Sequence, residues 1–167
     1  TGYKYEQKIN DFFSLENQKT KSFLDEYLNF GGYPKVVLEE KLTEKRKALD
    51  EIYHSYLEKD ISYLLKVEKI EAFSNLIKAL ADQLGQLVNY NEISCLLGIS
   101  LPTLKNYFWY GEKTFVFNKL SPYSKNIRKE ITKSPVVYFD DLGLRNYSLG
   151  RFGNLQNPSD FGPVFEN

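Results

Sequence analysis

The side chains of this chain that could carry out chemistry are concentrated in one basic stretch. Between Lys119 and Lys133 five bases stand against a single acid, Glu130. Lys and Arg side chains neutralise phosphates and supply most of the affinity of sequence-independent nucleic-acid binding. This stretch is therefore a candidate phosphate-binding surface, formed by Lys125, Arg128, Lys129 and Lys133. A solvated hairpin tip without a ligand would have the same composition.

Residue types that usually support catalysis are scarce. The single histidine, His54, leaves little scope for metal binding or for histidine-based nucleophilic catalysis, and we expect a surface or packed residue. The single cysteine, Cys95, excludes an internal disulfide and a cysteine-rich zinc site. Because Cys95 lies beside Leu96 and Leu97, we predict a small core residue at this position.

Two further patterns are candidate sites. The pair Asp140 and Asp141 follows a predicted strand, where it could bind a cation or simply end the strand in a turn. We favour the turn, because Asp forms local backbone hydrogen bonds there. The phosphate-loop pattern of ATPases is absent, and Gly111-Glu112-Lys113-Thr114, with a Glu between Gly and Lys, is interpreted as a turn.

Two helices are expected to position the basic stretch. Asn89 and Ser100 are candidate N-caps, and Gly98 between them is a candidate left-handed residue at a helix end. Pro102 fits the first turn of the second helix. Spacings of three and four residues predict the buried faces, which are Ile93, Leu96 and Leu97 in the first helix and Leu101, Leu104 and Phe108 in the second. A helix over Ile70–Leu84 would precede them.

A β-hairpin is expected after the second helix. Thr114–Leu120 predicts a strand with Phe115 and Phe117 on one side, Ser121–Ser124 a turn, and Pro135–Phe139 the return strand. The helices and this hairpin together predict a winged helix over residues 69–141, whose second helix often enters the DNA major groove.

The second helix itself leaves two interpretations of the winged helix open. Its exposed candidates for nucleic-acid contact are Thr103, Lys105 and Asn106, of which Lys105 joins the basic stretch as a candidate phosphate ligand. The run Tyr107–Tyr110 of four aromatics instead predicts packing against a neighbouring domain. The unit is accordingly either a protein-interaction module or a DNA-binding domain.

The first half of the chain predicts helices. A short helix is expected within residues 1–20 and another over Ser22–Asn29, ended by Gly31-Gly32. The longest helical region is expected over Leu42–Leu65, with a break near Lys59-Asp60. Residues 142–167, rich in Gly, Asn, Pro and Ser, predict an irregular tail. The fold class is therefore mainly α with one hairpin.

Composition restricts the class of protein. With 22 bases against 22 acids there is no global attraction to nucleic acid or acidic membrane, so any such partner must meet a local patch. No apolar run approaches the ~18 to 20 residues of a membrane span, and no signal peptide opens the chain. These features predict a cytoplasmic protein. Because residue 1 is Thr and the chain lacks Met, we expect a piece of a longer protein.

Several motifs together resemble a family of bacterial and archaeal AAA+-type ATPases that are usually described only as predicted ATP-binding proteins. Residues 23–37 resemble the family's F-x-x-Y-L-x-x-G-G-[FY]-P-x-V-V stretch, and Leu57–Ile61 its following helix. Gly98–Tyr107 resembles its G-[VI]-S-x-x-T-[VL]-x-x-Y motif. Matches to L-x-P-[YF]-x-x-N-x-x-K, Y-F-x-D-x-G-L and G-x-x-x-E-N follow in the family's order, at Leu120–Lys129, Tyr138–Leu144 and Gly162–Asn167.

The resemblance implies a role for each part. Residues 1–68 would form a helical lid in which Gly31, Gly32, Tyr33 and Pro34 touch the nucleotide, and residues 142–167 would lead into a further domain. The ATPase core, which binds ATP and Mg²⁺, would precede Thr1. This chain would thus be a lid plus winged-helix module that is not catalytic alone and requires no cofactor itself. Glu166 would open a restriction-endonuclease-like domain, so part of a nuclease remains a further alternative.

Overall fold

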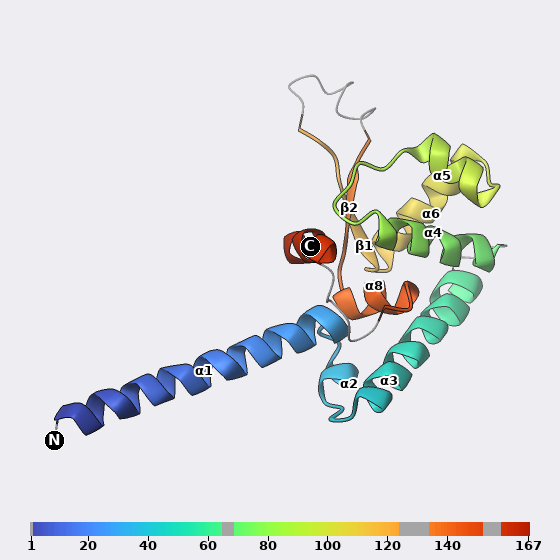
Figure 1. The fold of residues 1–167 in the computed structure, drawn as a ribbon. Helices are drawn as coiled ribbons and strands as arrows, with labels where there is room; N and C mark the ends of the chain where they lie inside the picture. Colours follow the sequence, from blue (N-terminus) through green and yellow to red (C-terminus); the bar gives the residue numbers. More distant parts are fainter. Residues whose placement is uncertain (1, 65–68, 124–133, 152–157) are drawn as a thin grey trace.

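The computed structural model describes residues 2–64, 69–123, 134–151 and 158–167, and these form a mainly helical body with one small sheet (Figure 1). The expected helical class is confirmed. The helices are α1 (Gly2–Phe30), α2 (Pro34–Val37), α3 (Leu42–Ser55), the π-helix η1 (Tyr56–Leu64), α4 (Ile70–Asp82), α5 (Tyr90–Leu97), α6 (Leu101–Lys113), α8 (Leu142–Ser148) and α9 (Pro158–Glu166).

Helix α1 is one continuous helix where the sequence predicted two. Its 29 residues make it longer than the region Leu42–Leu65, so the expectation that the latter is the longest helix is wrong. No Pro or Gly interrupts residues 3–30, and the polar residues near Thr20 continue the helix instead of ending it. The helix ends where expected, at Gly31, whose φ of +73° suits glycine.

The predicted break near Lys59-Asp60 is also wrong. Helix α3 passes directly into η1 at Tyr56, without a loop, and the wider π-helical turns continue to Leu64. π-Helical turns occur frequently at functional sites. Leu57 and Ile61 on this segment are buried, so the change of helical pitch keeps the apolar face directed at the core.

The predicted caps of α5 and α6 are confirmed. The side chain of Asn89 accepts from the backbone N–H groups of Asn91 and Glu92. Gly98 ends α5 with φ +61°, and Ser100 Oγ accepts from Thr103 N at 3.2 Å. These caps satisfy helix-end donors that would otherwise lack partners.

Burial around these helices differs from the prediction at four apolar positions. Ile93, Leu104 and Phe108 are buried as expected. The residues expected inside but found exposed or partly exposed are Cys95, Leu96, Leu97 and Leu101. An eight-residue helix packed on one side buries a narrow face, which here runs through Ile93 and Ser94.

Strands β1 (Phe117–Leu120) and β2 (Val136–Phe139) form an antiparallel pair with Phe117 opposite Phe139. The strand predicted from Thr114 begins three residues later, because Phe115 has a φ of +56° and breaks the extended backbone. Phe115 is therefore 74% exposed while Phe117 is fully buried, so the two do not share a side. Of the turn expected over Gly111–Thr114, residues 111–113 belong to α6, and the turn begins at Thr114. Glycine is required at position 111 because the ring of Phe117 packs where its side chain would lie.

The irregular tail expected over residues 142–167 is wrong in its described parts. Residues 142–148 form α8, whose side chains are almost all buried, and residues 158–166 form α9. The glycine and asparagine that suggested a loop, Gly143 and Asn146, instead allow α8 to approach its neighbours closely, as shown below.

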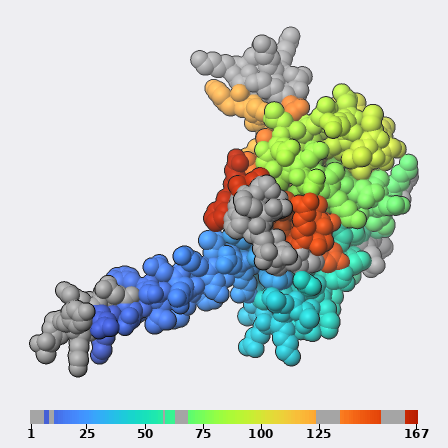
Figure 2. Space-filling model, in the orientation of Figure 1, coloured from blue at the N-terminus to red at the C-terminus, as the bar shows by residue number. Residues whose placement is uncertain are grey.

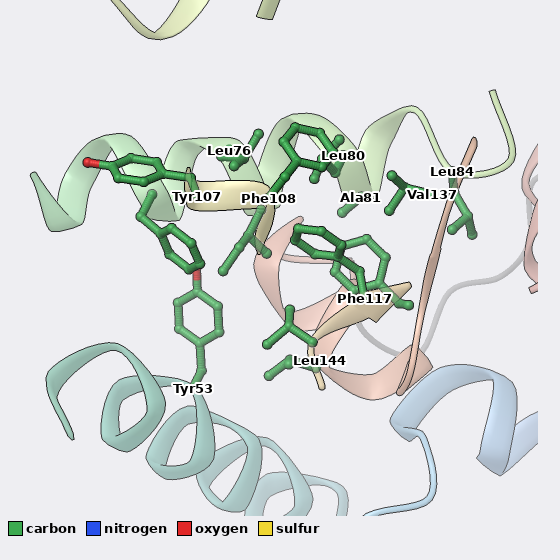
Figure 3. Packing of buried hydrophobic residues seen from close by; sticks show 14 of the residues in the cluster. Tyr53, Leu76, Leu80, Ala81, Leu84, Tyr107, Phe108, Phe117, Val137 and Leu144 are labelled. Carbon is green, nitrogen blue, oxygen red and sulfur yellow. The ribbon is translucent and has the colours of Figure 1, made fainter. Parts of the chain in front are cut away.

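One hydrophobic core joins both halves of the chain (Figure 3). Helix α8 lies against α1, α3 and α4 and follows β2, so its Leu144 belongs to the same core as residues from both halves of the chain. Aromatic rings continue this core across the sheet, with ring-centroid distances of 4.8 Å for Tyr90–Phe108, 5.6 Å for Phe108–Phe117 and 6.1 Å for Phe117–Phe139. Within the described residues no helix has the length and apolar character needed to span a membrane.

Candidate functional site

The turn after α1 is held by a residue more than a hundred positions away. Oδ2 of Asp141 accepts a hydrogen bond from Gly32 N at 2.7 Å, and Oδ1 accepts from Leu144 N at 2.9 Å. Asp141 therefore caps the N-terminus of α8 and fixes the Gly31–Pro34 turn with the same carboxylate. Of the two interpretations of the pair 140–141, the structure supports neither a plain turn nor a cation site for Asp141, whose oxygens are engaged by backbone N–H groups.

Glycines make this close approach possible. A Cβ at Gly31 would overlap the carboxylate of Asp141, and a Cβ at Gly143 would overlap the backbone carbonyl of Phe30. The end of α1 and the start of α8 are therefore in backbone-to-backbone contact, and no larger residue fits at either position.

Two further polar side chains of α8 satisfy the ends of other helices. Nδ2 of Asn146 donates to Leu28 O at 2.8 Å and to Asn29 O at 3.0 Å, at the C-terminal end of α1. Nε of Arg145 donates to Ala81 O in α4 at 3.0 Å, and its Nη1 donates to Asn146 Oδ1 at 3.0 Å. Carbonyls at helix C-termini have no partner within their helix, so these bonds fix α1 and α4 to α8.

Burial shifts the pKa of the Asp141 carboxyl. Loss of water around the buried group raises its pKa above the ordinary value of 3.8, and the backbone N–H groups of Gly32 and Leu144 oppose that rise. The pKa of the nearby Tyr33 hydroxyl is also raised, first by burial and then by the negative charges of Asp141 and Asp140. Tyr33 is therefore a neutral hydrogen-bonding group at physiological pH.

A cleft of about 480 Å³ opens beside the turn, between it, the α3–η1 junction and the residues after α6. Its polar rim includes Tyr33 and Lys35, which forms an ion pair with Glu51. Its deeper wall includes Tyr56, whose hydroxyl lies 2.8 Å from the hydroxyl of Thr114. A cleft lined by one base, the two acids Glu51 and Asp60, several hydroxyls and a few apolar side chains can hold a polar small molecule.

The predicted nucleotide-binding residues divide into two groups. The N–H of Gly31 donates to Tyr27 O at 2.8 Å and that of Gly32 donates to Asp141, so both backbone donors are engaged within the protein. Gly31 is buried, whereas Gly32 and Pro34 are exposed and Tyr33 lines the cleft. The surface of this turn that a ligand can reach is therefore its Tyr33–Pro34 edge.

The predicted nucleic-acid residues lie elsewhere. Lys105 is exposed on α6 and does not line the cleft. Lys125, Arg128, Lys129 and Lys133 lie outside the described residues. Lys119, at the base of the hairpin, pairs with Glu112 at 3.3 Å. Of the basic stretch, Lys119 is the base that lies within the described residues.

The aromatic run 107–110 does not form one surface for a neighbouring domain. Tyr107 and Phe108 point into the core of this chain, where Phe108 is 1% exposed. Trp109 faces outward at 51% exposure, on the same side of α6 as the exposed Lys105 and Asn106. Helical spacing explains the division, because consecutive residues point about 100° apart.

The remaining sequence candidates have structural partners. His54 is exposed on α3, and its Nδ1 lies 2.9 Å from Asp50 O. Glu166 Oε1 accepts from the Tyr138 hydroxyl at 2.9 Å, and the side chain of Asn167 bonds both the N–H and the carbonyl of Phe139. This pair therefore anchors α9 along β2. Among the described residues no cluster of three possible metal ligands occurs.

Sequence reasoning missed Asp141, Arg145 and Asn146 as the residues that organise the site. Local patterning predicts a turn at Asp141 and a loop after it, and it does not indicate a long-range contact. The available signal was the conjunction of buried-type residues, Leu142 and Leu144, with a capping Asp before them, which is typical of a helix N-terminus.

Comparisons with known proteins identify a family for this chain but no activity. A family model described as "Domain of unknown function (DUF8612)" matches residues 21–155. An "Uncharacterized protein" of Haemophilus influenzae (strain ATCC 51907 / DSM 11121 / KW20 / Rd) is 28% identical over 159 residues, which cover 89% of this chain. The matched part is 40% of that relative, so the chain spans less than half of its length. No solved structure matches. Because the family model covers most of the chain, this protein belongs to the DUF8612 family.

Proposed function

We propose that this chain is the lid and winged-helix portion of an AAA+-type ATP-binding protein, in which it serves as a regulatory or interaction module and is not catalytic alone. The proposal rests on the order of the family-like motifs and on one structural observation. The Gly31–Pro34 turn, which would meet the nucleotide, is bonded through Asp141 to α8, at the centre of the core. A displacement of the turn would therefore move α8 as well.

The nucleotide contact is assigned to the exposed edge of the turn. Since the N–H groups of Gly31 and Gly32 are engaged, Pro34 and the Tyr33 side chain are the parts available to a base or ribose. ATP and Mg²⁺ would be bound mainly by the ATPase core of the full-length protein, through a phosphate loop that this chain lacks. The lid edge would add the smaller share of the affinity.

The winged-helix assignment is supported by the succession α4, α5, Gly98, α6 and the β1–β2 hairpin on one core. Two capped helices joined by a left-handed glycine and followed by an antiparallel hairpin have the composition of such a unit. In the proposed role, α8 connects this unit to the lid turn, because Arg145 bonds α4 and Asn146 bonds α1.

Nucleotide titration of the full-length protein tests the proposal. We expect Pro34→Ala to weaken ATP and ADP binding by roughly three- to tenfold, since one apolar contact is worth about 1 kcal/mol. Pro102→Ala, at another exposed proline early in α6, is the matched control and should bind as wild type. Equal affinity of Pro34→Ala and wild type, with an unchanged fold, would contradict the lid role. The 167-residue chain alone should show no ATP turnover, and micromolar ATP binding by it would also count against the proposal.

A second candidate function, DNA binding, is favoured by the outward face of α6. Lys105, Asn106 and Trp109 are exposed together on this helix, and nothing among the described residues covers them. The four bases Lys125, Arg128, Lys129 and Lys133 alone would give three or four phosphate contacts. The logarithm of the binding constant should then fall with the logarithm of salt concentration with a slope of about −3 to −4.

Duplex DNA titrated at several salt concentrations distinguishes the two functions. Under the DNA-binding alternative, changing Arg128 and Lys129 to Ala lowers both the affinity and the salt slope. Changing Lys8 and Lys21 to Ala, which removes two bases from α1, should have no effect. Salt-independent or undetectable binding of the wild-type chain would leave the interaction module as the function of this unit.

A further inference from the structure

Helix α1 stands clear of the body over most of its length (Figures 1 and 2). Every residue from 11 to 25 is exposed, and only the last turns, with Leu28 and Phe30, are buried against the core. An isolated helix gains little from propensity alone, and helices in proteins are stabilised mainly by packing of an apolar face. The exposed part of α1 therefore requires a covering surface.

The exposed part carries a one-sided apolar stripe. Phe12, Phe13, Phe23, Leu24 and Tyr27 are between 40% and 69% exposed and lie on one face by their helical spacing, whereas Leu15, 57% exposed, lies nearer the polar face. The opposite face is polar and consists of Asp11, Ser14, Gln18 and Asp25. Large exposed apolar side chains in a contiguous stripe mark an interaction surface.

The stripe is symmetric about its own centre. The centre is at the level of Gln18, which itself lies on the opposite face. Phe12 and Leu24 are each six residues from Gln18, Phe13 and Phe23 are each five residues from it, and Glu16 and Thr20 are each two residues from it. When two copies of α1 run antiparallel around this level, Phe12 of each copy lies near Phe23 of the other along one edge of the stripe, and Phe13 lies near Leu24 along the other edge. A two-fold dimer requires such self-complementarity, because the same patch is used by both copies.

The polar centre of the stripe is compatible with this pairing. Glu16 and Lys19 form an ion pair at 3.2 Å within one helix, with both side chains well exposed. In the antiparallel pair Glu16 of each copy comes near Lys19 of the other, so the four charges alternate and sum to zero. Thr20, opposite Glu16, adds a hydrogen-bonding hydroxyl.

The position of the body favours the antiparallel over the parallel arrangement. Each body is attached beyond Leu28, ten residues from the centre. At about 1.5 Å per residue, the attachment points in the antiparallel pair are roughly 30 Å apart along the axis. A parallel pair would place both bodies side by side at the same end.

We propose that the exposed stripe of α1 is a dimerisation surface that binds a second copy of this chain in an antiparallel, two-fold arrangement centred on Gln18. This inference is independent of the nucleotide and DNA roles above. It assigns a partner to the part of α1 that lies largely outside the family-matched residues 21–155.

Sedimentation velocity over a concentration series of the 167-residue chain tests the proposal. We expect a dimer at micromolar concentration, and Phe13→Glu should raise its dissociation constant by about tenfold or more, since each copy loses a buried ring. Gln18→Glu adds the same charge to the opposite face of the same helix and should leave dimerisation unchanged. The body should remain folded in both variants, because neither side chain contacts the core.

Disulfide trapping determines the direction of the helices. In a Cys95→Ser background, a chain with Glu16→Cys mixed with a chain with Thr20→Cys should form the mixed disulfide, with little of either symmetric one. Predominantly symmetric disulfides would indicate a parallel pair and overturn the proposal. A chain that stays monomeric at ~100 μM, or a dimer insensitive to Phe13→Glu, would do so too and would indicate that an adjoining part of a longer polypeptide covers the stripe.

Discussion

Two glycine turns in this molecule have nearly the same backbone geometry and different causes. Gly31 ends α1 with φ +73°, and Gly98 ends α5 with φ +61°. At Gly98 the space that a side chain would occupy is open, with no atom within 4 Å. At Gly31 that space is filled by the carboxylate of Asp141. The first turn is thus fixed by a distant residue and the second by its own neighbours.

This difference shows that helices in this chain end in two ways, through bonds to nearby residues or through a bond to a distant residue. The α5–α6 turn is held by local bonds: Gly98 N donates to Cys95 O, Ile99 N donates to Ser94 O, and Ser100 Oγ accepts from Thr103 N. The α1–α2 turn is held by a carboxylate 109 positions away. A local turn tolerates changes elsewhere in the protein, whereas the Gly31 turn depends on the position of α8. Because of that dependence, the Gly31 turn is the better candidate for passing a displacement on to α8.

The largest expected difference between the two turns is in their tolerance of a methyl group. Both Gly31→Ala and Gly98→Ala pay about 1 kcal/mol for a left-handed alanine. Gly31→Ala must also displace the buried Asp141 carboxylate, so we expect a total loss of about 4 kcal/mol in the free energy of unfolding. Urea denaturation of the two variants measures this, with Gly98→Ala as the control. Equal losses would show that Asp141 moves aside freely and that the long-range link is weak.

A smaller loss is expected when the link itself is removed. Asp141→Ala leaves the N–H groups of Gly32 and Leu144 without their acceptor in a buried setting, which should cost about 2–3 kcal/mol. Asp140→Ala removes the neighbouring exposed carboxylate, whose partner is Asn118, and should cost less than about 0.5 kcal/mol. Hydrogen exchange should localise the effect of Asp141→Ala to the end of α1 and to α8. An effect confined to β2 would contradict the proposed link.

The sequence predicted the local turn well and the long-range one only in part. Asn89, Gly98 and Ser100 were identified because a cap and its helix lie within a few residues and follow fixed residue preferences. Gly31 was identified as a helix stop for the same reason. Its partner Asp141 was not, because nothing in local patterning specifies a contact between segments separated by a hundred residues.

Helix α8 shows why composition misleads in buried segments. Glycine and asparagine are typical of loops, and their frequency over residues 142–167 predicts an irregular tail. In the folded chain Gly143 permits contact with Phe30, and Asn146 binds carbonyls of α1. Both residue types serve close packing between elements, which only the tertiary structure reveals. The exposed positions Cys95 and Leu96 show the converse error, where apolar character alone suggested burial.

A third and smaller loss of stability is expected when the N-cap of α6, which belongs to the local turn, is removed. Ser100→Ala removes the side chain that accepts from Thr103 N and should lower the free energy of unfolding by about 1 kcal/mol. Ser121→Ala, at an exposed position after β1, is the control and should be neutral within about 0.5 kcal/mol. Chemical denaturation of both variants at constant pH provides the comparison. A loss for Ser100→Ala as large as that for Asp141→Ala would remove the distinction between the local and the long-range turn.

The smallest expected effect is the pH dependence that the buried carboxylate confers on the long-range turn. Because burial raises the pKa of Asp141 above 3.8, the folded state binds a proton at a higher pH than the unfolded state does. The free energy of unfolding should therefore rise as the pH falls through the raised pKa, and this gain is complete below the unfolded value of 3.8.

Asp141→Asn, which cannot titrate, isolates this contribution from that of the other carboxylates. The stability of wild type relative to Asp141→Asn should increase between neutral pH and about pH 4 when measured by urea denaturation at constant ionic strength. A relative stability that falls on acidification would mean that the hydrogen bonds from Gly32 and Leu144 outweigh burial. The carboxylate would then hold the turn most strongly in its charged form, and acid would loosen the link between α1 and α8.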